Sequence, residues 1–461
     1  MSAPWAGRRL HIVGIGGAGM SGLALVAHAL GAEVSGSDRA ESTYLARVRE
    51  AGVTVHVGHD AANVPDGEDV VVVSSTAVTE ENPERVAARE RGLPDLRRTA
   101  LLAEISALRP TIAVSGTHGK TTTASMVVHA LREVGLDPGY LVGGELRSTG
   151  SNAGWGEGEW LVVEADESDR SMLALRRDVA VVTNVELDHH ATYGSLRELQ
   201  AAFEEFLAPA EHRIVWEGAA LPEGSRAVQR SVTEEGAGSE SGGGVLRYGV
   251  PADLVLDDLG SGFAWRGHQV HLMVPGAHNA LNAVAALEAA RLAGAEEAAA
   301  AAALETFAGA GRRFERIGTT ASGAEVFDDY AHHPTEVRAT LEAARTRRPR
   351  RLVAVFQPHL YSRTAALAPE FGRALALADV IVVLDVYRAR EKPEDFPGVS
   401  GLMVAEAAYD AAPGRPVAWF PGFDAAEAYL RGLLREGDLV LTLGAGDVDT
   451  LGKRLVDTRT H

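Results

Sequence analysis

The stretch at residues 114–123 constrains the fold of this chain more than any other part of the sequence. An apolar run ends at Val114, a short loop with two glycines and Lys120 follows, and residues 124–131 have the composition of a helix. A strand, a tight loop and a helix in this order aim backbone N–H groups and a helix N-terminus at a phosphate. The stretch therefore predicts an α/β fold built around a phosphate site.

This loop departs from the strict phosphate-loop pattern. The pattern places a glycine five residues before Gly119, and this chain has Val114 there. The groups that act on phosphate are present, because Lys120 can reach the outer phosphates and the Thr121 hydroxyl can take a place on Mg²⁺. A glycine turn with an exposed lysine is the alternative that the stretch by itself leaves open.

The length of the chain is sufficient for several α/β domains. The sequence has 461 residues, which suggests roughly three domains at about 150 residues each. Its formal charge of −19 argues against a protein that binds nucleic acid or an anionic membrane as a whole. The chain has no cysteine, which excludes disulfides and thiolate metal sites and permits a reducing compartment.

The sequence does not predict export or membrane insertion. Residues 10–32 form an uncharged run that could pass for a signal peptide, but five glycines between residues 14 and 22 interrupt it. No other stretch has the apolar length of a membrane-spanning helix. We therefore expect a cytoplasmic protein. We also expect it to be a monomer or a homodimer.

A second glycine-rich motif lies near the N-terminus. Residues 14–19 read G-x-G-x-x-G between an apolar run and a predicted helix at residues 20–30, and Asp38 follows at about the distance of a ribose-binding carboxylate. Such a loop binds pyrophosphate at the helix N-terminus, so it predicts a bound nucleotide or sugar diphosphate. Taken alone, the motif also fits an NAD-dependent dehydrogenase or a glycine turn without a ligand.

Acidic residues follow a predicted strand at residues 160–164. Four acids occur in the six residues 164–169, and carboxylate oxygens are what Mg²⁺ prefers. A solvated acidic turn is the alternative. Another predicted strand, at residues 179–182, is followed by Asp188 and His189, an acid beside a histidine at a strand end.

Further polar residues follow strands or open a helix. His278, Asn279 and Asn282 begin an alanine-rich helix, where neighbours three and four apart share a face and can meet one ligand, with helix capping by Asn279 as the alternative. The last part of the chain alternates strands and helices again, which is the pattern of a parallel sheet. Its polar clusters at residues 328–334, 357–364 and 444–447 predict a site on one rim, facing the phosphate loop across a domain cleft.

Together these motifs resemble the Mur ligases. The match runs in order over nearly the whole chain, at residues 14–19, 116–123, 164–169, 183–189, 275–282, 311–314, 328–336 and 357–364. The resemblance implies an α/β protein of three domains: a Rossmann-like UDP-sugar-binding domain at 1–109, a central phosphate-loop ATP-binding domain at 110–313, and a Rossmann-like amino-acid-binding domain at 314–461. The proline after Arg109 agrees with the first boundary, because the residue before a proline disfavours helix.

The resemblance also implies an activity. ATP phosphorylates the carboxylate of UDP-N-acetylmuramate, an amine attacks the acyl phosphate, and ADP and phosphate leave; the motifs look like those of the branch that adds L-alanine in peptidoglycan synthesis. Two Mg²⁺ ions would neutralise the charge between carboxylate and triphosphate. The residues that would act in catalysis are Lys120, Glu164, His189 and Arg313, and those that would hold metal are Thr121, Glu164 and His189.

The resemblance assigns the binding residues by substrate. For ATP they are Gly116, Thr117, His118, Gly119, Lys120, Thr121, Thr122, His278, Asn279, Asn282, Arg313 and Asp329. For the UDP-sugar they are Gly16, Gly17, Ala18, Gly19, Ser37, Asp38, Ser74 and Ser75. For the amino acid they are Tyr330, His332, His359 and Arg363, with Arg363 suited to the carboxylate because a guanidinium matches it bidentately.

Two departures from the family pattern bear on which amino acid the ligase adds. Ligases that add later residues carry a carbamylated lysine after the Asp-His pair, and no lysine lies between His189 and Arg213, which agrees with the alanine-adding branch. Leu360 follows His359 where some relatives have arginine, so a preference for alanine over glycine or serine stays open. The alternatives are a recycling ligase that adds an intact peptide, which would share almost every motif, and an NAD-dependent dehydrogenase, which the phosphate loop and its acids disfavour.

Overall fold

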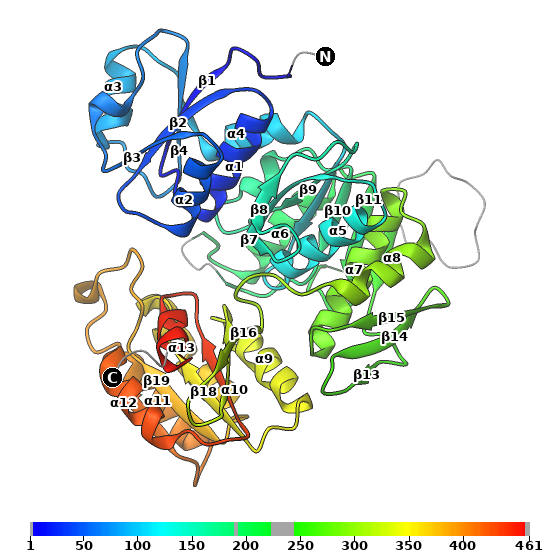
Figure 1. The fold of residues 1–461 in the computed structure, drawn as a ribbon, viewed down its shortest axis with the longest axis vertical. Helices are drawn as coiled ribbons and strands as arrows, with labels where there is room; N and C mark the ends of the chain where they lie inside the picture. The colour runs from blue at the N-terminus through cyan, green and yellow to red at the C-terminus, as the bar shows by residue number, and fades with distance from the viewer. Residues whose placement is uncertain (1–2, 189–191, 223–243, 457–461) are drawn as a thin grey trace. The chain divides into compact units, whose positions relative to one another are not determined.

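The computed structural model describes residues 3–188, 192–222 and 244–456. The chain forms two compact units (Figure 1). The first unit comprises Met1–Gly249, Trp265–His268 and Leu281–Leu304, and the second comprises Val250–Ala264, Gln269–Ala280 and Glu305–His461. Within the described residues, no helix combines the length and the hydrophobicity that crossing a membrane requires.

The first unit opens with a five-stranded parallel sheet of order β3-β2-β1-β4-β5. Its strands are β1 (Arg9–Val13), β2 (Glu33–Asp38), β3 (Thr54–Val57), β4 (Val70–Ser74) and β5 (Asp95–Arg97), and its helices are α1 (Ala18–Ala29), α2 (Thr43–Glu50), η1 (Ala61–Asn63), α3 (Pro83–Glu90) and α4 (Arg98–Ser106). Strand order reverses at β1, because β2 pairs on one side of it and β4 on the other. Open α/β sheets bind ligands at the carboxyl ends of strands beside such a reversal.

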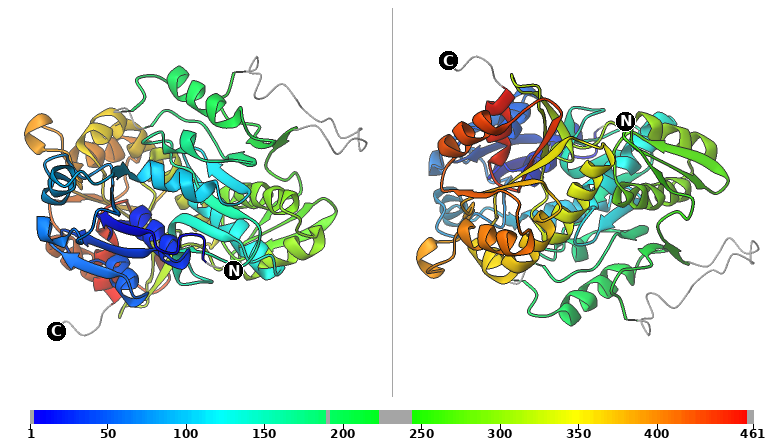
Figure 2. Two further views of the ribbon diagram at one scale, coloured as in Figure 1. Left: turned by 90° about the horizontal axis from the view of Figure 1, so that it is seen from above. Right: turned by 90° about the horizontal axis from the view of Figure 1, so that it is seen from below.

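The central sheet of the first unit has seven strands in the order β12-β11-β10-β6-β9-β7-β8, with only the β7–β8 pair antiparallel. The strands are β6 (Thr111–Ser115), β7 (Gly139–Leu146), β8 (Ser151–Gly154), β9 (Leu161–Glu164), β10 (Val179–Val182), β11 (His212–Trp216) and β12 (Val245–Tyr248). The helices of this region are α5 (Lys120–Glu133), η2 (Ser171–Ala174), α6 (Leu196–Leu207), α7 (Ala277–Leu292), α8 (Glu297–Ala303) and η3 (Leu304–Thr306). Helix α8 packs on α5 (Figure 2).

The two sheets of the first unit share one hydrophobic core. Helix α1 packs against β7 and β8, and Leu23 of α1, Leu141 of β7 and Val163 of β9 are all buried in that core. Gly22 allows the close approach, since a Cβ there would lie 3.2 Å from side-chain atoms of Leu141 and Ala153. This packing holds the glycine loop before α1 close to the strand ends of the central sheet.

The second unit is built on a six-stranded sheet of order β16-β17-β21-β18-β19-β20, in which only β16–β17 is antiparallel. Its strands are β16 (Glu315–Thr319), β17 (Glu325–Asp329), β18 (Arg351–Phe356), β19 (Val380–Leu384), β20 (Val417–Phe420) and β21 (Asp438–Leu443), and its helices are α9 (Pro334–Thr346), α10 (Tyr361–Leu375), η4 (Pro393–Asp395), α11 (Gly401–Ala411), α12 (Phe423–Leu433) and α13 (Val448–Val456). A separate three-stranded sheet contains β13 (Val255–Leu256), β14 (Ser261–Trp265) and β15 (His268–Leu272).

Strand β18 is covered by helices on both faces of the sheet, which explains its apolar sequence. Leu352, Ala354 and Phe356 pack with α9, α10 and α11. Val353 and Val355, which point to the opposite face, pack with α12 and α13. A parallel strand covered by helices on both faces needs apolar side chains at every position.

The predicted α/β class is confirmed, and the structure corrects several element boundaries. Helix α5 begins at Lys120 rather than at residue 124, because Gly119 adopts a left-handed φ of 83° that turns the loop directly into the helix. The elements that were not predicted include the antiparallel strand β8 and the strands β13 and β14 of the short sheet.

Candidate active site

The phosphate loop joins β6 to α5 and depends on its two glycines. Gly116 has a φ of 136°, and a Cβ there would lie 2.0 Å from the Thr183 hydroxyl oxygen. A Cβ at Gly119 would lie 2.7 Å from the side-chain oxygen of Asn282. The loop backbone therefore packs tightly against neighbouring polar groups, and Asn282, one of the predicted ATP-binding residues, lies beside it.

Lys120 lies over the loop and is held by three partners. Its Nζ donates to the carbonyl oxygens of Gly116 at 2.7 Å and Thr117 at 3.2 Å, and it lies 2.9 Å from Oε2 of Glu167, whose side chain is 1% exposed. Burial alone would lower the pKa of Lys120, but the carboxylates of Glu167 and Asp166 raise it above its ordinary value. Lys120 is therefore a cation at neutral pH, available to an anionic phosphate.

Thr121 and Glu164 form an oxygen-rich group beside the loop. The Thr121 hydroxyl donates to Oε1 of Glu164 at 3.0 Å, and the Gly143 N–H donates to Oε2 at 2.5 Å. A Cβ at Gly143 would lie 2.8 Å from both carboxylate oxygens. Hydroxyl and carboxylate oxygens are suitable ligands for Mg²⁺, so this pair fits the metal site predicted from the sequence. His189, the third predicted metal ligand, lies outside the described residues.

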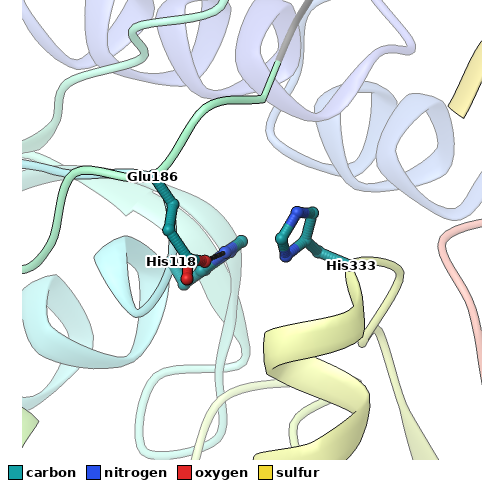
Figure 3. A group of neighbouring side chains, drawn as sticks. All are labelled: His118, Glu186 and His333. Carbon is teal, nitrogen blue, oxygen red and sulfur yellow. Dashed lines mark hydrogen bonds and ion pairs between the residues drawn. The ribbon is translucent and has the colours of Figure 1, made fainter. Parts of the chain in front are cut away.

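The loop is tied to the residues that follow β10. The Asn184 side chain accepts from the backbone N–H of His118 at 2.8 Å and donates to its carbonyl at 2.9 Å. Figure 3 shows the Glu186 carboxylate against the His118 ring, with Nε2 and Oε2 2.9 Å apart. His333, also labelled there, is the N-cap of α9. The sequence indicated a polar stretch after β10. It did not predict that residues of this stretch form hydrogen bonds with the phosphate loop.

The N-terminal glycine loop is held by Asp38. The N–H of Gly16 donates to Oδ2 of Asp38 at 2.9 Å, and a Cβ at Gly16 would lie 3.0 Å from that oxygen. Helix α1 follows, with Gly17 as its N-cap. The loop and helix N-terminus thus have the form that binds pyrophosphate. Contact between Asp38 and a ribose stays a prediction.

A buried polar network lies behind this loop. Ser37 is fully buried, and its hydroxyl donates to Oε2 of Glu84 at 2.6 Å. His59 Nδ1 lies 3.2 Å from the same oxygen, and the Asn63 amide donates to Oε1 at 2.7 Å. Burial raises the pKa of Glu84, but the nearby His11 and the hydrogen bonds from Ser37 and Asn63 outweigh it and lower the pKa to about 2. Glu84 was not among the predicted site residues.

A cavity of about 360 Å³ in the first unit extends from the glycine loop before α1 to Glu164 at the end of β9. The glycine loop before α1 lines one side of it, as do Ser75 and Arg98, while Glu164 and Asp166 line the other. Asn152 also lines the cavity; its amide donates to the carbonyl of Ala18 at 2.7 Å, and its buried Oδ1 has no hydrogen-bond partner among the described residues. Ser74, predicted beside Ser75, is buried at the end of β4 and does not line the cavity.

In the second unit, the predicted rim of polar residues is present. The N–H of Gln357 donates to Leu443 O at 2.9 Å, and that of Gly444 donates to Asp329 O at 3.1 Å. The ends of β18, β21 and β17 therefore lie side by side. Asp329 accepts from the N–H groups of Phe314 and Ala331 at 2.7 and 2.8 Å, and burial, partly opposed by Arg313, raises its pKa to about 6.

Residues near the start of α7 are also buried or form hydrogen bonds with the protein. The Asn279 amide donates to the carbonyl of Pro275 at 2.7 Å. Burial and the nearby charge of Arg313 lower the pKa of His278 to about 4, so its ring is neutral at pH 7. Arg313 in turn lies over the Tyr330 ring, at 5.2 Å from its centroid. The proposed contacts of these residues with ATP stay predictions.

The structure brings the four predicted amino-acid-binding residues together. The rings of Tyr330 and His332 are 5.3 Å apart, and those of His332 and His359 are 5.9 Å apart. The Arg363 guanidinium lies 3.4 Å from Nδ1 of His359. Tyr387 stacks on His359 with ring centroids 5.7 Å apart, and it was not predicted because it follows a different strand, β19. This group can receive a carboxylate at Arg363 within aromatic walls.

Comparisons with known proteins agree with this arrangement. Three family models match successive parts of the chain: the Mur ligase family catalytic domain at residues 9–109, the Mur ligase middle domain at 114–290, and the Mur ligase glutamate ligase domain at 312–446. They confirm the predicted organisation into three α/β domains.

Individual relatives cover the whole chain. The UDP-N-acetylmuramate–L-alanine ligase of Mycolicibacterium smegmatis is 45% identical over 99% of this chain and 96% of its own length, and that of Streptomyces coelicolor is 46% identical over 98% of each. Among solved structures, the UDP-N-acetylmuramate–alanine ligase of Thermotoga maritima has a TM-score of 0.80 and 29% identity, covering 97% of this chain and 98% of its own. A murein peptide ligase of Psychrobacter arcticus has a TM-score of 0.69 and 25% identity, with the same coverage. From these matches and the geometry of the two glycine loops, we conclude that the chain belongs to the Mur ligase family.

Proposed function

We propose that this chain is an ATP-dependent ligase that joins L-alanine to the carboxylate of UDP-N-acetylmuramate, an early step of peptidoglycan synthesis. The observation that carries the proposal is the cavity that connects the glycine loop before α1 with Glu164 beside the phosphate loop. A sugar nucleotide held by its pyrophosphate at the first loop can extend its carboxylate toward the second. The 45% identity to alanine-adding relatives supports this choice of substrates.

The chemistry requires an activated carboxylate. A carboxylate is a poor electrophile, whereas an acyl phosphate gives an attacking amine a good leaving group. Lys120, held as a cation by its carboxylate neighbours, would balance the charge of the transferred phosphoryl group. Thr121 and Glu164 would hold Mg²⁺, which supplies charge neutralisation between carboxylate and triphosphate. A second Mg²⁺, with His189 as ligand, is a further proposal that rests on the family resemblance.

The remaining roles follow the domains. We assign UDP-sugar binding to residues 1–109, ATP binding to 110–313 and amino-acid binding to 314–461. Arg363 would bind the alanine carboxylate, with Tyr330, His332 and His359 around it, and Arg313 and Asp329 would contribute to the ATP site. A cytoplasmic location follows from the supply of ATP and UDP-sugar that the reaction needs, and a monomer or homodimer remains our prediction.

The proposal is tested by measuring phosphate release from ATP. We expect release only when UDP-N-acetylmuramate and L-alanine are both present. Equal release with a tripeptide in place of alanine would favour the recycling ligase, whose relative from Psychrobacter arcticus shares the fold at lower identity. Reduction of NAD without ATP turnover would indicate a dehydrogenase instead.

A further inference from the structure

Arg98 lies at the start of α4 and is held by one carboxylate. Its Nη1 donates to Oδ2 of Asp169 at 2.9 Å, and Oδ1 of Asp169 accepts the backbone N–H of Ser171 at the same distance. Both side chains of this ion pair are only 18% exposed. Because Asp169 is itself anchored, the pair fixes the direction of the guanidinium.

The rest of the guanidinium makes no hydrogen bond with the described residues. A guanidinium has five N–H groups, and Nε and Nη2 form one of its edges as a fork. This edge faces the start of α1, since a Cβ at Gly19 would lie 3.3 Å from Nε and 3.7 Å from Nη2. The donors that Asp169 leaves unused therefore lie against the helix turn that follows the glycine loop.

The cavity beside this edge needs a cation if it is to hold a sugar nucleotide. Arg98 lines the cavity together with Gly17 and Gly19, and among the described residues that line it Arg98 is the one with a positive charge. The acidic residues Glu164 and Asp166 line it as well. A pyrophosphate carries two negative charges, which these carboxylates repel and which a guanidinium offsets.

A second observation indicates that this cavity receives a ligand. Asn152 lines it and is 1% exposed, and its Oδ1 has no hydrogen-bond partner in the part of the chain that the structure describes. Buried acceptors are nearly always paired, because leaving one unpaired is costly. A sugar with hydroxyl and amide donors can supply the missing partner.

We propose that Arg98 is a binding residue for the sugar nucleotide, that its Nε and Nη2 donate to the pyrophosphate received by the glycine loop, and that Asp169 is the positioning residue that holds the guanidinium. The inference rests on the proposed ligase function and adds to it a cation from α4. A glycine loop and a helix N-terminus offer a phosphate N–H donors and a partial positive charge. Arg98 supplies the full charge, and two parallel N–H···O bonds would also orient the phosphate.

The position of the fork favours the pyrophosphate over the carboxylate of the same ligand. Nε and Nη2 lie beside Gly19, at the end of the loop that has the form of a pyrophosphate site. The carboxylate has to reach the group of Thr121 and Glu164, where we place Mg²⁺. Arg98 should therefore contribute to the binding of any UDP-sugar, with or without a carboxylate.

Calorimetric titration with two UDP-sugars tests this assignment. The ligands are UDP-N-acetylmuramate and UDP-N-acetylglucosamine, which lacks the muramoyl carboxylate. We expect Arg98→Gln to weaken the binding of both by about 10- to 100-fold, because charge-assisted hydrogen bonds are lost. Arg98→Lys keeps the charge without the fork and should lose roughly tenfold or less. In turnover, Arg98→Gln should raise the KM for UDP-N-acetylmuramate with little change in kcat or in the KM for ATP.

Two further variants separate this role from a structural one. Arg97→Gln is the matched control, because Arg97 precedes Arg98, lies 3.6 Å from Glu80 and is 44% exposed, but does not line the cavity. It should bind both ligands as wild type does. Asp169→Asn breaks the same ion pair and leaves the cation of Arg98 in place, so its loss of affinity should be clearly smaller than that of Arg98→Gln.

The result that overturns the proposal is unchanged affinity for both ligands in Arg98→Gln, or equal losses in Arg98→Gln and Asp169→Asn. A loss confined to UDP-N-acetylmuramate would also overturn it, since Arg98 would then bind the carboxylate. If wild-type protein binds neither UDP-sugar, the proposed ligase function itself fails, which is a separate result.

Discussion

Lys120 and Glu167 form an ion pair at the phosphate loop, with Nζ 2.9 Å from Oε2. The Glu167 side chain is almost completely buried, and a buried charge is costly to leave without its partner. The pair therefore has two consequences: it sets the direction of the lysine, and it makes the loop sensitive to the loss of either residue.

Replacing Lys120 by methionine should abolish ligase turnover, because the cation that balances the charge of the transferred phosphoryl group is lost. Binding of UDP-N-acetylmuramate, measured by calorimetry, should survive. The variant should also be less stable by about 3–5 kcal/mol, since Glu167 is left buried without its cation. Combining Lys120→Met with Glu167→Gln should restore stability but not turnover. Normal turnover in Lys120→Met would remove the phosphate loop from the mechanism.

Gly116→Ala should destabilise the first unit and reduce ATP turnover. The new Cβ would meet the Thr183 hydroxyl at 2.0 Å in a backbone with a φ of 136°, and we expect a cost of about 3 kcal/mol or more. Gly92→Ala is the control, because Gly92 also has a positive φ, 68°, but open space around it. Its expected cost is about 1 kcal/mol, without loss of activity. Equal urea midpoints for the two variants would show that the positive φ, and not the contact with Thr183, accounts for the loss of stability.

Glu84 should make stability depend on pH in the acid range. Its pKa is lowered from 4.5 to about 2 in the folded chain, so the folded state prefers the ionised form. The resulting stabilisation is complete above the unfolded pKa of 4.5 and is lost as pH falls toward 2; it amounts to at most about 3 kcal/mol. Urea unfolding of Glu84→Gln should show a weaker dependence on pH than wild type between pH 5 and 2. Parallel curves for the two proteins would contradict this assignment.

Arg363→Lys should raise the KM for L-alanine by about tenfold or more with a smaller change in kcat, because lysine cannot match a carboxylate bidentately. The KM values for ATP and UDP-N-acetylmuramate should not change. Arg373→Lys, on the same helix α10 and with a side chain 58% exposed, is the control. An unchanged alanine KM in Arg363→Lys would place the carboxylate elsewhere.

The sequence predicts those site residues that lie at the carboxyl ends of parallel strands. Glu164 lies beside Thr121 because β9 pairs in parallel with β6, which places the carboxyl ends of both strands together. The same rule brings the ends of β17, β21 and β18 together. Polar residues after apolar runs were therefore a sufficient signal for these groups.

Partners that depend on side-chain packing could not be predicted in this way. Glu167 stands in an acidic run with no local signal that separates it from Asp166 or Asp169, and its pairing with Lys120 depends on the path of the loop after β9. Tyr387 meets His359 only because two loops converge in the second unit. The burial of Ser37 against Glu84 likewise depends on α3 packing behind the first sheet.

The transfer of oxygen from the sugar carboxylate to phosphate tests the central claim most directly. UDP-N-acetylmuramate labelled with ¹⁸O in its carboxylate would be incubated with the protein, ATP and L-alanine, and the released phosphate analysed by mass spectrometry. Activation through an acyl phosphate predicts that one ¹⁸O atom enters phosphate for each amide bond formed. Amide formation with unlabelled phosphate, or phosphate release without any amide, would contradict the account.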